Sequence, residues 1–392
     1  MDYLAKLRRN ITISYITCFF ESLLFFLPIW YSFEIRFADP GLLSVIYAAT
    51  YGITIILEIP TGALADLLGR KTTIIIGTLL QSLGWLIISQ TDGLERLILG
   101  YVFNAVGVAL VSGANTALIF DTLKELGKEK DFAKFNSKCA VIFRSGMIIS
   151  TLAGGYIYLA DKGLPYILVG ICFGLSGLVS LKLMEPKIDT EKFSWANYIN
   201  QTKLGINQLG SNTKIKWYSI YYLIFGGAGW YFLFFLNQSY ATQVGFNEVE
   251  KSWIFSTIFL LIGIIGVISA KYSHKYRFFI IFIALITIGG YILGGIVNKT
   301  GALVSIFLVQ LAGTMRFSFL DQYANDQLES KYRATSLSVL NMMVGMVFVA
   351  LSLGLSKIIT LEGAKVAMMV IGVISLLVGI PVTVKVLANE KD

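Results

Sequence analysis

The chain alternates long apolar runs with short polar segments along almost its whole length. Each apolar run holds about 20 residues, which is what an α-helix needs to cross the hydrocarbon core of a bilayer. The runs are continuously apolar instead of alternating, so they favour helices over the strands of a membrane barrel. They predict twelve spans, at residues 11–31, 41–64, 73–91, 95–118, 137–159, 163–184, 215–239, 251–271, 277–297, 302–325, 334–356 and 363–387.

Composition agrees with a chain that is dissolved in lipid. Of its 392 residues, 56% are hydrophobic and only 14% are charged, whereas about a quarter of the residues of a soluble protein are charged. The net charge of +8 is spread along the chain in small groups, so we expect no nucleic-acid partner. The three cysteines, Cys18, Cys139 and Cys172, are odd in number and lie in apolar runs, which argues against a disulfide scaffold.

The positive charges predict the orientation. Most of the 32 lysines and arginines fall in the head, the tail and alternate connecting segments, and cytoplasmic loops carry this excess. The first run follows Lys6, Arg8 and Arg9 without a cleavage site, so we interpret it as an uncleaved span. The sequence therefore predicts a multi-pass protein of the cell membrane, with both termini in the cytoplasm.

A polar linker divides the spans into two equal sets. The longest hydrophilic stretch, residues 185–214, follows the sixth span and includes apolar positions at near-helical spacing. We expect a short interfacial helix within it. The predicted domains are an N-terminal six-helix bundle over residues 1–184, this cytoplasmic linker, and a C-terminal six-helix bundle over residues 215–392. Two six-span repeats are typical of a secondary transporter.

One loop carries a specific motif. The segment Gly62-Ala-Leu-Ala-Asp66-Leu-Leu-Gly69-Arg70-Lys71 lies between the second and third spans. It resembles the signature that the major facilitator superfamily has in this loop. The resemblance extends over the whole chain and implies an all-α membrane protein with twelve helices in two six-helix halves. It also implies that Asp66 faces the start of the eleventh span as a gate latch and that Arg70 pairs with Asp121.

Weaker signatures resemble the drug/proton antiporter branch of that family. Leu27-Pro28 is similar to its first-span proline, and Gly146-x-x-x-Ser150-Thr151-x-x-Gly154-Gly155 is similar to its fifth-span motif. The motif's central Gly-Pro is replaced by Ser150-Thr151. The fourth span has Tyr101 where the branch has an arginine, so a proton relay would not be built on that arginine.

Charged residues within spans are rare and expensive, so each predicts a function. Glu21 lies in the middle of the first run, on one helical face with Phe25 and Pro28. A carboxyl group in so apolar a setting suits a reversible proton carrier or a cation site. The alternative is a static ion pair, for which Arg144 in the fifth span is a candidate partner.

The resemblance implies that the first, fourth, seventh and tenth spans line a central cavity. It favours Glu21, Asn104, Asn115, Arg316 and Asp321 as cavity or coupling residues, with Glu21 and Asp321 for proton coupling. The predicted substrate cavity is completed by Phe25, Arg144, Tyr231 and Asn341. The gate motif consists of Gly62, Asp66, Gly69, Arg70, Lys71 and Asp121.

These residues favour a secondary transporter that exports lipophilic or amphipathic small molecules in exchange for protons by alternating access. A proton symporter or uniporter that imports a polar or anionic metabolite is the first alternative, since Arg144 and Arg316 could bind an anion. A sensor or lipid-handling protein on the same scaffold is the second. No P-loop, Cys/His metal spacing or Ser/His/Asp arrangement is present in the sequence. We therefore expect no enzyme activity, cofactor or metal, and a monomer in the bilayer.

Overall fold

A computed structural model describes residues 3–187, 195–272, 275–316, 319, 323, 328 and 333–389. Within these ranges the regular structure is entirely helical, which confirms the predicted all-α class. A long apolar segment can bury its backbone polar groups in a membrane only by bonding them within itself, so helices are the expected outcome.

The chain forms two compact units, each made from more than one stretch of sequence. Unit 1 comprises Met1–Ala38, Thr50–Ser194 and Glu248–Thr257, and unit 2 comprises Asp39–Ala49, Trp195–Asn247 and Ile258–Asp392. Helices α3 (Pro40–Leu68) and α11 (Glu248–Ser269) are therefore divided, because each begins in one unit and ends in the other.

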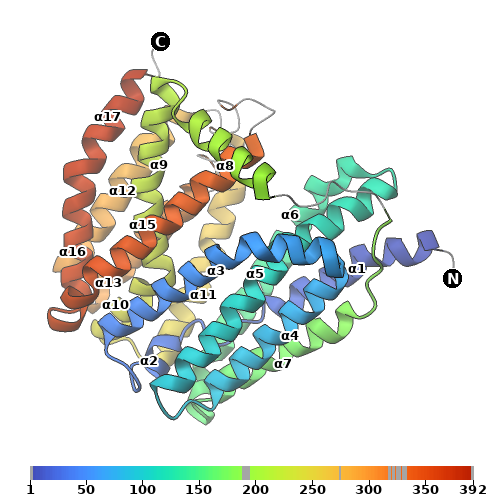
Figure 1. Cartoon of the computed structure of the whole chain (residues 1–392). Helices are drawn as coiled ribbons and strands as arrows, with labels where there is room; N and C mark the ends of the chain where they lie inside the picture. The colour runs from blue at the N-terminus through green and yellow to red at the C-terminus, as the bar shows by residue number, and fades with distance from the viewer. Residues whose placement is uncertain are drawn as a thin grey trace. The chain divides into compact units, whose positions relative to one another are not determined.

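Unit 1 is built mainly from the blue to green helices of Figure 1. Besides the parts of α3 and α11, its elements are α1 Tyr3–Glu21, α2 Trp30–Glu34, α4 Arg70–Ser89, α5 Leu94–Glu125, η1 Glu129–Asp131, α6 Phe132–Ala160 and α7 Leu164–Ser180. Helix α4 packs against both α5 and α7, and α1 packs against α6 and α7. The helices thus form a bundle in which α1 has neighbours on two sides.

Unit 2 holds the remaining helices (Figure 1). They are α8 Trp195–Leu209, α9 Thr213–Tyr231, η2 Phe232–Leu236, α10 Asn237–Gln243, η3 Ala270–Tyr272, α12 Tyr276–Ile296, α13 Lys299–Met315, α15 Arg333–Leu361, α16 Ala364–Ile374, η5 Ser375–Gly379 and α17 Ile380–Asn389. Elements η2 and η5 are single π-helical turns, which continue the helix before them into the helix after them. Such turns interrupt regular backbone bonding and are common at functional sites.

The helices match the predicted apolar runs closely. Nine segments in the described part of the chain are long and apolar enough to cross a membrane, and Leu164–Ser180 and Lys299–Met315 are shorter apolar helices. The predicted continuous helix over residues 11–31 is the exception, because α1 ends at Glu21 and α2 begins only at Trp30. The intervening residues form turns, so that prediction was wrong.

Small residues on α6 explain how the break is accommodated. A Cβ atom added at Gly146 would collide with the Ser22 side chain, and one added at Gly154 would meet the Phe25 carbonyl oxygen and lie 2.8 Å from Pro28 Cγ. Between them, Ser150 Oγ lies 3.5 Å from the Ser22 carbonyl oxygen, which also accepts a hydrogen bond from the Leu24 amide at 3.0 Å. The fifth-span glycine motif therefore provides room for the turns after α1.

We expect Gly154→Ala to destabilise the protein by about 1–3 kcal/mol, because the new methyl group must displace backbone of the break. Gly113→Ala on α5 is the matched control, since a Cβ there meets nothing within 4 Å and alanine is the better helix former by up to about 1 kcal/mol. Equilibrium unfolding in mixed micelles would measure both. Equal free energies of unfolding for the two variants would contradict this role of Gly154.

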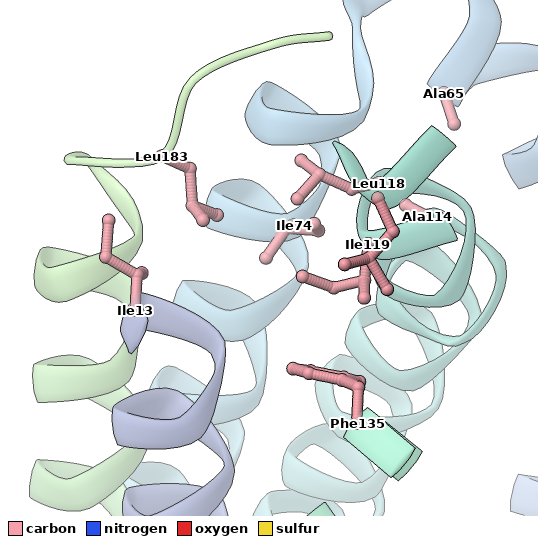
Figure 2. Packing of buried hydrophobic residues seen from close by; sticks show 9 residues of the cluster. Ile13, Ala65, Ile74, Ala114, Leu118, Ile119, Phe135 and Leu183 are labelled. Atoms are coloured by element: carbon pink, nitrogen blue, oxygen red, sulfur yellow. The ribbon is translucent and has the colours of Figure 1, made fainter. Parts of the chain in front are cut away.

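A compact apolar cluster ties the helices of unit 1 together (Figure 2). Figure 2 shows Ile13 of α1 and Leu183, which follows α7, near Ile74 of α4. The α5 side chains form one side of the cluster, and Phe135 of α6 lies below them. The buried members are Ile13, Ala65, Ile74, Ala114, Leu118, Ile119, Leu123, Phe135 and Leu183. Because van der Waals contacts within this cluster join five helices, it fixes the wall of the cavity described below.

In unit 2, the start of α3 is joined to the end of α15 by one carboxylate. Asp39 Oδ1 accepts hydrogen bonds from Thr360 Oγ1 at 2.6 Å, from the Gly41 amide at 3.0 Å and from the Leu42 amide at 3.2 Å. The bond from Thr360 crosses from α3 to α15. The two amides belong to the first turn of α3, where backbone donors have no acceptor within the helix. Asp39 thus serves as both a cap and a cross-link.

We expect this contact to depend on pH. The Thr360 hydroxyl, and then the two amides, hold the pKa of Asp39 below its ordinary value. Its stabilisation is therefore present above the unfolded-state pKa of about 4 and is lost as the pH falls through the lower folded-state pKa. Hydrogen-exchange protection of Gly41 and Leu42 should fall below pH 4 in the wild type. In Asp39→Asn it should be weaker at all pH values and lack this transition; a shared transition would contradict the assignment.

Candidate functional site

Glu21 lies on the wall of a cavity inside unit 1. The cavity has a volume of about 240 Å³ and is lined by residues of α1, α5 and α6. The lining residues are Ser14, Cys18, Glu21, Asn115, Thr116, Ile119, Phe132, Phe135, Asn136, Cys139 and Phe143. Glu21 and Asn115, which the sequence analysis favoured from two different spans, therefore face the same space.

The carboxylate of Glu21 has a neutral partner. Ser176 Oγ of α7 donates to Glu21 Oε1 at 2.7 Å, and Glu21 makes no ion pair with Arg144 within the described residues. Arg144 is half-buried on α6 and does not line the cavity. Because a hydroxyl can donate to a carboxylate or accept from a carboxylic acid, Ser176 can serve both protonation states of Glu21.

Two other predicted cavity residues of unit 1 lie elsewhere. Phe25 belongs to the turns after α1 and contacts α6 at Gly154. Asn104 is only 5% exposed and packs against α4, where a Cβ added at Gly84 would lie 2.7 Å from its Nδ2. Asn104 therefore faces a helix interface, the role that interhelical amides often have.

Unit 2 has its own buried polar group around Arg316. The guanidinium carbon of Arg316 lies 4.4 Å from the ring centroid of Tyr222, and the side chain is 1% exposed. Tyr222 in turn donates to Asn341 Oδ1 at 3.1 Å. A Cβ added at Gly226 would lie 3.1 Å from Arg316 Nη1, so this glycine makes room for the cation. The arrangement joins Arg316 and Asn341 through Tyr222.

Tyr231 occupies a separate place on the same helix. Its hydroxyl lies 3.3 Å from Ser44 Oγ, and its ring stacks on Phe235 with centroids 5.9 Å apart. It is completely buried. Tyr231 therefore packs the start of α3 against α9 and is not grouped with Arg316 by any of these contacts.

A buried carboxylate that the sequence analysis missed lies in α2. Glu34 is 0% exposed, and its Oε1 accepts hydrogen bonds from Tyr101 at 2.5 Å and from Tyr166 at 2.8 Å. Lys251 is equally buried nearby, with Nζ 2.6 Å from Ser32 Oγ. Tyr101 replaces the arginine of the antiporter pattern, and that replacement was the one signal in the sequence that pointed here.

The gate motif contains the ion pair that the family resemblance implied. Arg70 pairs with Asp121, whose side chain is 7% exposed, and Arg70 Nη1 also donates to the Ala117 carbonyl at 3.0 Å. Gly69 has φ of +86°, a conformation that favours glycine, and it begins the turn into α4. Gly62 lies within α3. The side chain of Asp66 and the whole of Asp321 lie outside the described residues.

Glu185 completes the gate motif, and the prediction did not include it. Its two carboxylate oxygens accept from the amides of Arg70 and Lys71, each at 2.8 Å. This carboxylate caps the first turn of α4, where the helix dipole favours negative charge. The neighbouring Met184 exchanges two hydrogen bonds with Asn10 of α1, so the start of the linker is anchored to unit 1.

Within the described ranges, no group of three or more His, Cys, Asp or Glu side chains could hold a metal ion. The described polar groups of the two units include carboxylates, hydroxyls, amides, guanidinium groups and the ammonium of Lys251. Of these groups the carboxylates can take up and release protons, and the others can form hydrogen bonds with polar groups of a small molecule.

Two curated relatives are proteins of drug resistance. The class H tetracycline resistance protein of Pasteurella multocida is 24% identical over 231 residues, covering 58% of this chain and 54% of that protein. The quinolone resistance protein NorA of Staphylococcus aureus (strain MSSA476) is 26% identical over 199 residues, covering 47% of this chain and 49% of that protein. The chain thus spans about half the length of the curated relatives that it matches.

The fold and the family are established by two further comparisons. The crystal structure of the nucleoside transporter NupG superposes with a TM-score of 0.73 over 100% of both chains, at 15% identity, which shows the fold alone. The family pattern described as Major Facilitator Superfamily matches residues 11–352. This confirms the family that the gate motif indicated, and the chain belongs to the Major Facilitator Superfamily.

Proposed function

We propose that this multi-span transporter exports lipophilic or amphipathic small molecules in exchange for protons by alternating access, with Glu21 as the proton-coupling group. The observation that carries the proposal is the position of Glu21, a carboxylate on the wall of a cavity, bonded to a neutral hydroxyl. A permanently paired carboxylate would be held ionised, whereas this one is free to take up and release a proton.

The lining of the cavity supports the substrate class. Three phenylalanines and Ile119 provide apolar contact area, while Asn115, Asn136 and Ser14 provide a few polar groups. Binding pockets for small molecules commonly combine an apolar wall with a small number of placed polar groups. The similarity to NorA and to the class H tetracycline resistance protein, although low, supports compounds of the kind for which those relatives are named.

The gate network supports alternating access. Arg70, Asp121 and Glu185 join α4, α5 and the start of the linker at one end of unit 1. We place this end, both chain termini and the linker in the cytoplasm, because most lysines and arginines lie there under the positive-inside rule. The protein would act in the cell membrane, and we expect it to do so as a monomer.

Reconstituted proteoliposomes test the proposal directly. Vesicles that contain the wild-type protein should accumulate tetracycline or a fluorescent quinolone against its gradient when a pH gradient is imposed. The accumulation should collapse when a protonophore is added, because the driving force is the proton gradient. Movement that follows only the compound's own gradient, with or without the protonophore, would overturn proton coupling. Movement of neither compound would restrict the proposal to other substrates of this class.

The Arg316 group favours a second candidate, import of an anionic metabolite. A buried guanidinium over the ring of Tyr222, whose hydroxyl bonds to Asn341, could recognise a carboxylate or phosphate in a bidentate manner. If this candidate is correct, Arg316→Lys should abolish transport of the anion, because an ammonium cannot reproduce the planar contact. Under the export proposal, the same variant should still move tetracycline or the quinolone.

A further inference from the structure

Two of the three cysteines meet on the wall of the cavity. Cys18 of α1 and Cys139 of α6 are 121 residues apart in the sequence, yet the Cys18 thiol donates to the Cys139 carbonyl oxygen at 3.4 Å. Both side chains are half-buried and both line the cavity. We refer to them below as the Cys18–Cys139 dithiol.

The surroundings of this pair hold it in place. Cys139 packs against the apolar cluster of unit 1, in which Ile119 and Phe135 also border the cavity. Cys18 lies one helical turn before Glu21 on α1, so the two side chains share a helical face. The third cysteine, Cys172 of α7, is buried and is not part of the cavity lining. Two thiols are therefore pre-positioned at one accessible place, and the third is excluded from it.

We propose that the Cys18–Cys139 dithiol is a capture site for a ligand that bonds two sulfur atoms at once, of which a trivalent arsenical is the simplest. Such a ligand needs two neighbouring thiols and no further protein ligand. The absence of a third His, Cys, Asp or Glu ligand among the described residues therefore favours this class over a divalent metal ion. The same proximity makes the pair able to close into a disulfide.

Both reactions balance without any group from outside the named reactants. An organic arsenoxide, R–As=O, reacts with the two thiols to form two S–As bonds, and its oxygen leaves as water with the two thiol protons. No atom changes oxidation state in that step. In the second reaction, a diazene oxidant takes two electrons and two protons from the thiols and becomes a hydrazine, while one S–S bond forms. Each step consumes one dithiol and one reagent molecule.

Occupation of this site has a consequence for the cavity. Bridging the two sulfurs places the arsenic and its organic group in the space that Glu21 and Asn115 also border. A captured ligand would therefore compete for the same volume as a transported molecule. The capture itself does not depend on the proposed transport function, because it requires only the dithiol geometry.

The first test measures binding of phenylarsine oxide to the purified full-length protein in detergent. Wild type and Cys172→Ser should each bind one equivalent, whereas Cys18→Ser and Cys139→Ser should bind at least tenfold more weakly, because each retains only one of the two sulfurs. Size-exclusion profiles would confirm that the variants are folded. Undiminished binding by either single variant, or loss of binding in Cys172→Ser, would overturn the proposal.

The second test needs no variant. Wild-type protein treated with diamide, digested and analysed by mass spectrometry should yield a disulfide-linked peptide pair that contains Cys18 and Cys139, with Cys172 still alkylatable after denaturation. Prior addition of phenylarsine oxide should suppress this cross-link. A cross-link that involves Cys172, or no cross-link although both thiols are alkylated rapidly by N-ethylmaleimide, would contradict the dithiol.

Discussion

Replacement of Glu21 by glutamine should eliminate uphill transport driven by a pH gradient, while downhill exchange of the same compound continues. Glutamine keeps the size and the hydrogen bond with Ser176 but cannot bind and release a proton at neutral pH. Coupling requires that the carboxyl group change its charge during each cycle, so the loss of accumulation should be complete. The measurement is accumulation of tetracycline or a fluorescent quinolone in proteoliposomes with an imposed pH gradient.

Glu95→Gln is the matched control for this experiment. Glu95 lies exposed in the first turn of α5, and its substitution makes the same chemical change away from the cavity. That variant should accumulate the compound as the wild type does. Undiminished uphill transport in Glu21→Gln would remove Glu21 from the coupling mechanism even if the protein proves to be an exporter. Loss of both uphill and downhill transport would indicate instead that the carboxylate binds the substrate.

Removal of the Arg70 side chain should produce the largest loss of stability among single substitutions in the gate motif. Arg70→Ala leaves the carboxylate of Asp121, whose side chain is 7% exposed, without its cation. Breaking a buried ion pair from one side costs about 3–5 kcal/mol, because the remaining charge is neither hydrated nor neutralised. Equilibrium unfolding in mixed micelles should show a decrease of this order, and transport should fall with it.

Substitution of Asp121 separates the effect of the buried charge from the effect of lost packing at Arg70. Asp121→Asn removes the buried charge, so the double variant Arg70→Ala/Asp121→Asn should be more stable than Arg70→Ala alone. Lys71→Ala is the control within the same motif, and we expect a change within about 0.5 kcal/mol because the Lys71 side chain has no ion pair in the described structure. If the changes in unfolding free energy of the two single variants summed to that of the double variant, a direct interaction between Arg70 and Asp121 would be contradicted.

The order and type of the helices followed from the sequence because bilayer physics constrains them strongly. Each apolar run must become a helix, and the charged or glycine-containing segments between runs set its ends. Helix α5, Leu94–Glu125, covers the predicted span 95–118, and α15, Arg333–Leu361, covers the span 334–356. The prediction of one continuous helix for the first run was wrong, because turns form after Glu21. The space for these turns is provided by glycines of α6, more than 100 residues away in the sequence.

The residues that the sequence analysis singled out for the site are those that a charge in an apolar run or a known motif marked. Glu21 stood out because a carboxylate in an apolar run is rare, and Arg70 and Asp121 stood out through the family motif. Glu34 and Glu185 did not, since a glutamate near the end of an apolar run is ordinary. Their importance depends on partners from other helices, the hydroxyls of Tyr101 and Tyr166 for Glu34 and the first amides of α4 for Glu185.

The sequence by itself determined the helical membrane class and the family. It could do so because hydropathy, helix length and charge are local properties, which each segment carries regardless of its neighbours. Only the tertiary structure decided that Glu21 binds Ser176 and not Arg144, that Asn104 faces a helix, and that Cys18 meets Cys139. These are long-range contacts, and they depend on which helix faces pack together, which no single apolar run specifies.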